Sequence, residues 1–244
     1  FGVFNTVSNI WEPRGYAGTY GNNGFRLDFA NSSALGNDVS GNDNDFTANN
    51  LTSIDQATDT CSNNFATFNA LDFSGGALSN GNLTQTNSGA CNTNGTIGVT
   101  QGKWYWEFKM VSASGGVIGI GDGTAKLGTA LADLDKIYGY SPNGNKYENT
   151  TSSSYGATYT TGDIISVAFN ADTRELEFYK NGVSQGVAFT VDAGFTYLPQ
   201  FHLSNSNVNV NFGNPPFTIS SGNSDANGHG NFEYAVPSGY FALC

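Results

Sequence analysis

The chain has 244 residues, and charged side chains make up 12% of it, about half the share of an ordinary globular domain. Its net charge of −11, with no cluster of Lys or Arg to offset it, argues against nucleic acid and anionic membrane surfaces as partners. No apolar run approaches the roughly 18 residues of a membrane span, so we expect no membrane insertion. The chain begins at Phe1 rather than Met, which suggests a processed or incomplete N-terminus.

The N-terminal part is poor in strand patterns. Asn23–Phe29 reads as one strand, and a long region rich in Asn, Ser, Thr and Gly follows it. Within that region Asp38, Asp43 and Asp45 stand among the neutral polar side chains typical of calcium loops. The spacing fails the EF-hand template, since no register places a Gly at position 6 and a Glu at position 12. An irregular calcium site made of these three carboxylates and backbone oxygens is one hypothesis. The other is that these side chains satisfy backbone groups in a tight connection.

In the rest of the chain, apolar and polar residues alternate with the period of two residues that is typical of β-strands. Lys103–Val111 places Trp104, Trp106, Phe108 and Met110 on one face, as a strand with one buried side does. Gly116–Gly121, Asp163–Asn170 and Arg174–Lys180 read as further strands. Asn181 and Gly182 follow, and both tolerate the positive φ of a type I′ hairpin turn. Many short strands separated by turn signals predict an all-β, antiparallel sandwich with an irregular N-terminal extension.

Three cysteines are present, Cys61, Cys91 and Cys244, and none belongs to a C-x-x-C pair. A zinc site is therefore not expected. Cys61 and Cys91 could form a disulfide, or all three thiols could be reduced; the sequence leaves both open.

Several motifs between residues 98 and 217 resemble a SPRY domain, a curved sandwich of concanavalin-like shape. They are "GKWYWEFKM", "GVIGIGD", "YGYSPNGNKY", "TGDIISVAFNADTRELEFYKNGVSQGVAF" and "YLPQFHLSNSNVNVNFG", in the order of that family. The resemblance implies three parts: an extension over 1–97 that wraps or leads into the sandwich, the sandwich over 98–220, and a tail over 221–244 that packs back on it.

The upstream residues 23–51 and 59–71 are similar to the segment that precedes SPRY-like domains in bacteriophage tail fibres, although Cys61 stands where that pattern has Pro. This second resemblance implies a virion surface protein, a homotrimeric tail-fibre or spike module that binds a host cell-surface glycan or receptor. The alternative is a capsid-decorating or fibre-assembly protein that contacts other virion proteins.

Catalysis is not expected. Glycoside hydrolysis uses two carboxylates across a cleft, and the nearest pair here, Glu175 and Glu177, sits on the polar face of one predicted strand. His202 alternates with apolar neighbours, as a hydrogen-bonded strand residue does, and His229 lies in a predicted loop. A glycan-cleaving enzyme on the same fold is the third hypothesis.

Binding is the function that the resemblance implies, through loops that correspond here to Asp122–Asp135, Ser141–Tyr159 and Thr190–Tyr197. Aromatic rings together with amides suit neutral sugars, because CH groups stack on a ring while hydroxyls are hydrogen-bonded. No cofactor other than calcium is expected. The candidate ligand residues all come from the middle loop: Asn143, Asn145, Tyr147, Asn149, Tyr155 and Tyr159.

Overall fold

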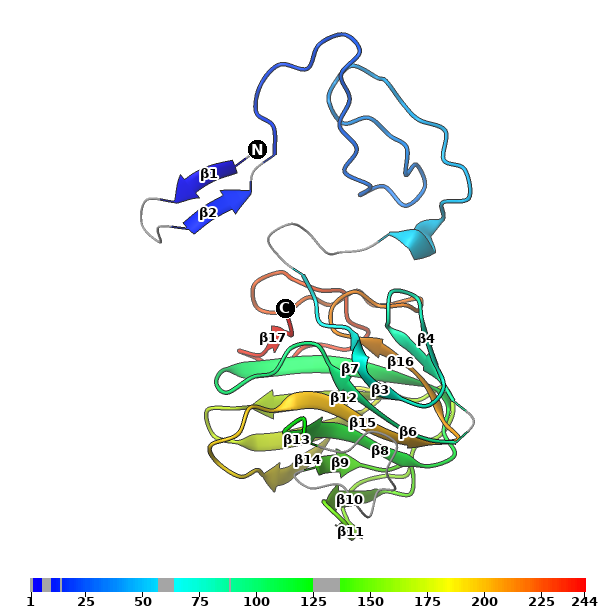
Figure 1. Cartoon of the computed structure of the whole chain (residues 1–244), viewed down its shortest axis with the longest axis vertical. Helices are drawn as coiled ribbons and strands as arrows, with labels where there is room; N and C mark the ends of the chain where they lie inside the picture. Colours follow the sequence, from blue (N-terminus) through cyan, green and yellow to red (C-terminus); the bar gives the residue numbers. More distant parts are fainter. Residues whose placement is uncertain (1, 6–9, 14, 57–63, 88, 125–136) are drawn as a thin grey trace. The chain divides into compact units, whose positions relative to one another are not determined.

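A computed structural model describes residues 2–5, 10–13, 15–56, 64–87, 89–124 and 137–244 (Figure 1). It divides the chain into two compact units, Phe1–Asn64 and Phe65–Cys244. Among the described residues, no helix is long and apolar enough to cross a membrane.

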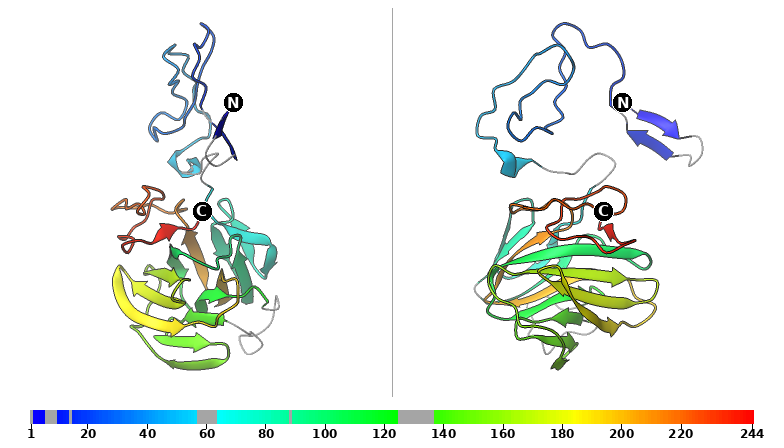
Figure 2. Two further views of the ribbon diagram at one scale, coloured as in Figure 1. Left: turned by 90° about the vertical axis from the view of Figure 1, so that its left-hand side faces the viewer. Right: turned by 180° about the vertical axis from the view of Figure 1, so that it is seen from behind.

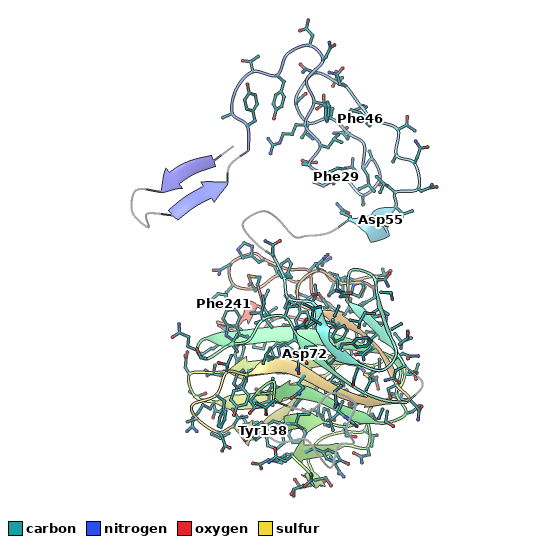
Figure 3. The ribbon with its side chains drawn as sticks, in the orientation of Figure 1. Phe29, Phe46, Asp55, Asp72, Tyr138 and Phe241 are labelled. Atoms are coloured by element: carbon teal, nitrogen blue, oxygen red, sulfur yellow. The ribbon has the colours of Figure 1, made fainter. Side chains whose placement is uncertain are left out.

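The first unit is mostly irregular. Strands β1 (Gly2–Asn5) and β2 (Ile10–Pro13) form an antiparallel pair, and one 3-10 turn, η1, spans Ser53–Asp55. The strand expected over Asn23–Phe29 is wrong, because that stretch makes only the isolated bridge between Leu27 and Asp38. Phe29 and Phe46, both labelled in Figure 3, are each 48% exposed.

Asp38 organises the loop of the first unit. Its carboxylate accepts backbone N–H bonds from Arg26 (2.8 Å), Ser40 (2.8 Å) and Asn44 (3.0 Å) and one from the Ser40 hydroxyl (2.7 Å). Asp45 in turn accepts the N–H of Asp38. Burial raises the pKa of Asp38, but the hydrogen bonds outweigh it and hold that pKa at about 2. The expectation that these side chains satisfy backbone groups is confirmed for Asp38 and Asp45.

The same bonds bear on the calcium hypothesis. The oxygens of Asp38 point at N–H and O–H donors, and Asp43 serves as a turn residue with a φ of +56°. Within the described part of the chain, no three His, Cys, Asp or Glu side chains are arranged to hold a metal ion.

The second unit is a sandwich of two antiparallel sheets, stacked as Figures 1 and 2 show. The seven-stranded sheet has the order β11-β10-β9-β8-β15-β6-β3, and the other has the order β14-β13-β12-β7-β16-β5-β4, with β17 beside β7. The strands are β3 (Phe68–Ser74), β4 (Ala77–Ser79), β5 (Thr84–Thr86), β6 (Ala90–Gly95), β7 (Lys103–Ser112), β8 (Gly116–Gly121), β9 (Ile137–Tyr140), β10 (Asn145–Glu148), β11 (Thr151–Ser154), β12 (Ile164–Asn170), β13 (Glu175–Lys180), β14 (Val183–Thr190), β15 (Leu198–Ser204), β16 (Asn207–Asn211) and β17 (Phe241–Ala242).

The alternation along β7 builds the core between the sheets. The rings of Phe108 and Phe201 meet at 4.5 Å, and the ring of Phe68 lies 5.0 Å from Phe201. Asn181 (φ +48°) and Gly182 (φ +77°) connect β13 to β14, which confirms the predicted hairpin.

The sandwich begins earlier than expected. Strands β3 to β6 belong to its two sheets, with β6 paired to β15 and β5 paired to β16. The boundary at 97/98 is therefore wrong and lies at 64/65. Strands β4 and β5 have three residues each, and β6 is rich in Asn, so neighbouring strands define them more than their own pattern does.

The C-terminal segment packs on β7 of the eight-stranded sheet, on the side of that strand that points away from the core. β17 pairs with β7 in parallel, and the ring of Phe232 packs on Tyr105 at 5.2 Å. Glu107 on β7 accepts the N–H groups of Glu233 (3.0 Å) and Tyr234 (2.9 Å). The face of β7 opposite the core is consequently buried too, with Glu107 at 0% exposure.

Candidate functional site

The middle loop expected over Ser141–Tyr159 is largely the hairpin of β10 and β11. Tyr159 is 4% exposed, and its hydroxyl donates to the carbonyl of Tyr140 at 2.9 Å. Tyr155 packs its ring on Tyr140 (5.3 Å) and Phe178 (6.1 Å), and its hydroxyl donates to the carbonyl of Gly186. Tyr159 is thus part of the core and its ring is not available as a platform for a sugar, whereas Tyr155 is half-buried with its ring packed against the core.

The four other candidates divide between turns and one face of the sheet. Asn143 accepts the N–H of Asn145 at 3.0 Å, and Asn149, with a φ of +54°, accepts the N–H of Ile137 at 3.2 Å. The first bond closes a turn, whereas the second joins the start of β9 to the residue that follows β10. Asn145 and Tyr147 are two residues apart on β10, and so they share the face of the seven-stranded sheet that points away from the core. We call this face the outer face.

A buried set of polar side chains lies on the outer face. In the register of β6 with β15, Asn94 stands opposite Gln200 and Asn92 opposite His202. We call these four residues the polar row, and each is at most 4% exposed. His202 Nδ1 lies 2.6 Å from Asn92 Oδ1. The expectation that His202 is hydrogen-bonded is therefore confirmed. Burial lowers its pKa, which favours the neutral ring.

Two acceptors of the polar row have no hydrogen-bond partner among the residues that the structure describes. Asn94 Nδ2 donates a hydrogen bond to Asp72 Oδ2 at 2.6 Å. Asp72 belongs to β3 and is labelled in Figure 3. Asn94 Oδ1 and Gln200 Oε1 are buried and make no hydrogen bond within the described part of the chain. A buried polar atom without a partner costs about 1–3 kcal/mol, so each requires an explanation.

Apolar residues adjoin the polar row on the same face. Val117 stands opposite His202 in the register of β8 with β15, and it packs with Ile137 and Tyr147. Between the two sets lie glycines of β8 and β9. A Cβ at Gly121 would fall 1.4 Å from Gln200 Oε1, so any other residue there would displace the Gln200 carboxamide from its present position. The outer face thus combines buried acceptors with the apolar side chains of Val117 and Ile137, which are buried as well.

Glu175 and Glu177, the carboxylates considered for catalysis, form hydrogen bonds with nearby hydroxyl groups. Glu175 accepts the hydroxyl of Thr173 at 2.8 Å, and Glu177 accepts that of Ser184. His229 is exposed, and its backbone N–H donates to Asp225 at 2.9 Å. These side chains do not converge with the polar row.

The described residues do not test the cysteine prediction. Cys91 is buried on β6, and its Sγ accepts N–H bonds from Gln85 and Asn87. Cys61 lies outside the described residues, so the Cys61–Cys91 disulfide stays a prediction. The side chain of Cys244 is exposed.

Comparison with known proteins matches one family model to this chain and aligns about half of the chain with parts of otherwise different proteins. The model of the SPRY domain matches residues 103–215. The chain is 30% identical over 132 residues to the ATP-dependent RNA helicase Ddx1 of Drosophila melanogaster, covering 52% of this chain and 18% of the helicase. It is 30% identical over 128 residues to the E3 ubiquitin-protein ligase RKP of Arabidopsis thaliana (49% and 10%) and 37% identical over 125 residues to Ran-binding protein 10 of Danio rerio (48% and 20%). The chain therefore spans only a small part of each of these relatives.

A solved structure supports the same fold. The SPRY domain of human HERC1 superposes with a TM-score of 0.50 at 23% identity, over 59% of this chain and 96% of that domain. The order of motifs, the two-sheet sandwich and the match of the family model lead to one conclusion: residues 103–215 of this chain belong to a SPRY domain.

Proposed function

We propose that this chain is a non-enzymatic recognition protein that binds its partner on the outer face of the SPRY sandwich. The observation that carries the proposal is the pair of buried acceptors Asn94 Oδ1 and Gln200 Oε1, which have no partner among the described residues and lie beside the apolar side chains of that face. Both atoms accept hydrogen bonds and are buried in this structure, so a partner that reaches them must donate O–H or N–H groups and displace the groups that bury them. The half-buried residues Asn145 and Tyr147 lie on the same face.

The relatives support a binding role over a catalytic one. The matched segment is between 10% and 20% of three proteins whose names state a helicase, a ligase and a Ran-binding protein. A segment shared by proteins of such different activity is best understood as a common recognition module. The local bonding of Glu175 and Glu177 agrees with this reading.

The virion setting rests on the upstream resemblance and on the weakly charged polar surface. In that setting the partner is a host cell-surface glycan or receptor, and the protein is displayed on the particle as a homotrimer. The relatives named above are all eukaryotic and lend this setting no support. Capsid decoration or fibre assembly, through contacts with other virion proteins, is the alternative, and a particle reconstruction separates the two by position and copy number.

The binding role is tested with the full chain on an array of neutral oligosaccharides. We expect the wild type to bind and Tyr147→Ser to bind about tenfold more weakly, a loss of about 1.4 kcal/mol. The control is Tyr16→Ser, which removes an exposed tyrosine of the first unit. Equal binding by wild type and Tyr147→Ser would remove the outer face from the proposal. No binding by the wild type would favour the protein-contact alternative.

A further inference from the structure

A hollow of about 280 Å³ lies within the first unit, and the function proposed above does not use it. We call it the loop hollow. Residues 32–37 form one wall, and Asp45, Phe46, Ala48 and Leu51 form the other. Its volume is just below the ~300–1,000 Å³ of small-molecule pockets, so it suits one small group or one long side chain.

Backbone contacts hold the two walls together. The N–H of Phe46 donates to the carbonyl of Gly36 at 2.8 Å, and the N–H of Asp38 donates to Asp45 Oδ1 at 2.8 Å. A Cβ at Gly36 would fall 1.8 Å from the Phe46 carbonyl oxygen, so glycine lets the walls approach this closely. Leu35 is buried and gives the hollow an apolar side. The loop hollow is therefore fixed by the fold of the loop itself.

The polar side chains of this loop divide into two groups. Asn42 and Asn44 donate to backbone carbonyl groups of residues 21–24, and so they hold the loop in shape. The hydroxyls of Ser32 and Ser33, by contrast, form no hydrogen bond with any residue that the structure describes, although both residues line the hollow. The fold uses the first group, and the second is available to a ligand.

Asp45 supplies the charge at the loop hollow. Its Oδ1 is occupied by the N–H of Asp38, while its Oδ2 accepts no hydrogen bond within the described part of the chain. No Lys or Arg of the described ranges forms an ion pair with it. Residues 1–64 contain seven acidic and two basic side chains, a net charge of −5. The local field therefore attracts a cation and repels an anion.

The other wall suits the stem that carries such a cation. The ring of Phe46, labelled in Figure 3, stands edge-to-face with that of Phe25 at 4.7 Å and is exposed. Leu51 is exposed in the same lining. An aromatic face attracts a cation, and apolar side chains cover the methylene groups behind it. A carboxylate, hydroxyls, a ring and an aliphatic surface together match an ammonium group on an aliphatic stem.

We propose that the loop hollow binds the side chain of a lysine residue on a partner protein. Its ammonium group has three donors, which reach Asp45 Oδ2 and the hydroxyls of Ser32 and Ser33. Its stem lies along Phe46 and Leu51. Lysine is preferred to arginine because a guanidinium pairs best with two carboxylate oxygens at once, and Asp45 Oδ1 is already occupied.

The surface of the first unit indicates that the lysine belongs to a protein. Phe25, Phe29 and Val39 are exposed in the same unit as the hollow. A free amine would leave these side chains in water, whereas a protein surface would cover them. The lysine site is separate from the outer face and requires no glycan, so Tyr147→Ser should leave it unchanged.

The experiment titrates the isotope-labelled full chain with capped lysine (Nα-acetyl-lysine N-methylamide) and follows its amide resonances by NMR. We expect shifts at the amides of Asn37, Phe46 and Leu51, with binding that weakens as salt is added. Capped norleucine, which has a similar stem without the charge, should bind about tenfold more weakly. Capped arginine and n-butylamine should also bind more weakly than capped lysine.

Two pairs of variants test the residues of the loop hollow. Asp45→Asn keeps an acceptor for the Asp38 N–H but removes the charge, and it should bind about tenfold more weakly. Asp43→Asn is its control, because it removes the same charge from an exposed residue outside the lining. Phe46→Leu should bind about threefold more weakly. Its control is Phe29→Leu, since both rings are 48% exposed and Phe29 is not in the lining.

Several results would overturn the proposal. Capped lysine that shifts no amide of the lining would remove the site, and capped norleucine that binds equally well would remove the role of the charge. Equal weakening by Asp45→Asn and Asp43→Asn would show attraction to the net charge alone. Equal or tighter binding of capped arginine or n-butylamine would contradict the assignment to lysine in a protein. If the Asp38 amide shows that Asp45→Asn has lost its bond, the Phe46 and Phe29 pair decides.

Discussion

Replacing Glu107 by Gln probes how the C-terminal segment is held to the sandwich. The buried carboxylate accepts four bonds, from Tyr105 (3.1 Å) and Tyr234 (2.9 Å) at Oε1 and from Asn211 (3.1 Å) and Glu233 (3.0 Å) at Oε2. Gln keeps one oxygen and replaces the other by an NH₂ donor, so two of the four donors lose their acceptor. Each unsatisfied donor costs about 1–3 kcal/mol, so the free energy of unfolding would fall by about 4 kcal/mol.

An opposing effect reduces that figure. Burial raises the pKa of Glu107, which means that the charge is costly to bury although four donors oppose the shift. Gln removes the charge and recovers part of that cost. We therefore expect a net loss of about 2 kcal/mol, equivalent to a melting temperature lower by about 4–8 °C for a unit of this size.

Calorimetry and amide exchange measure the two aspects of this prediction. The melting temperature of Glu107→Gln should fall, and the amides of Glu233 and Tyr234 should exchange faster than in the wild type. Glu148→Gln serves as the control, because Glu148 is an exposed carboxylate on β10. A Glu107→Gln variant at least as stable as the wild type, with unchanged exchange, would refute the reasoning by showing that the cost of the buried charge exceeds the value of its four bonds.

Three further predictions concern a turn, a loop and a boundary. Gly182→Ala should lower the unfolding free energy by about 1–2 kcal/mol in urea titrations, since φ is +77° and the new Cβ would lie 2.6 Å from Tyr234; an unchanged midpoint would contradict this. Because the pKa of Asp38 is lowered from 3.8 to about 2, its ionised carboxylate stabilises the loop at pH values above 3.8, and this stabilisation is lost as the pH falls through about 2. Hydrogen exchange of the amides bonded to Asp38 should show the loss, and protection of these amides that stays unchanged down to about pH 2 would argue against it. Removing residues 1–64 should leave the melting of the sandwich nearly unchanged, whereas removing 1–97 deletes β3 to β6 and should lower it strongly, and equal melting of the two truncations would count against the boundary at 64/65.

The sequence predicts those parts of the fold in which local pattern and tertiary position agree. The alternation around Trp106 and Phe108 is confirmed, and so is the turn at Asn181 and Gly182, because side-chain period and turn chemistry are local properties. The strands β3 to β6 are defined by their neighbours in the sheets. Their own residues, such as Asn92 to Gly95, read equally well as irregular chain.

In the candidate site, too, local sequence predicts some features, while others depend on tertiary structure. Tyr155 and Tyr159 look like ligand residues in a Ser/Thr-rich segment, but whether a ring lies on the surface or in the core depends on the path of the hairpin, which sequence does not state. Asn94 and Gln200 are 106 positions apart and meet only through the pairing of β6 with β15. An alternation of Asn residues in "CNTNG" was the one local sign that polar side chains share a face there.

The most direct test of recognition on the outer face is Gln200→Met, with binding and melting measured on the same preparation of the full chain. Met has a similar shape and removes the unpartnered acceptor, so the folded protein should be as stable as the wild type or more stable. If Gln200 Oε1 is kept for a partner, binding on the oligosaccharide array should fall at least tenfold. Binding equal to that of the wild type, or a clear loss of stability, would contradict the account, because the carboxamide would then serve the fold and not the partner.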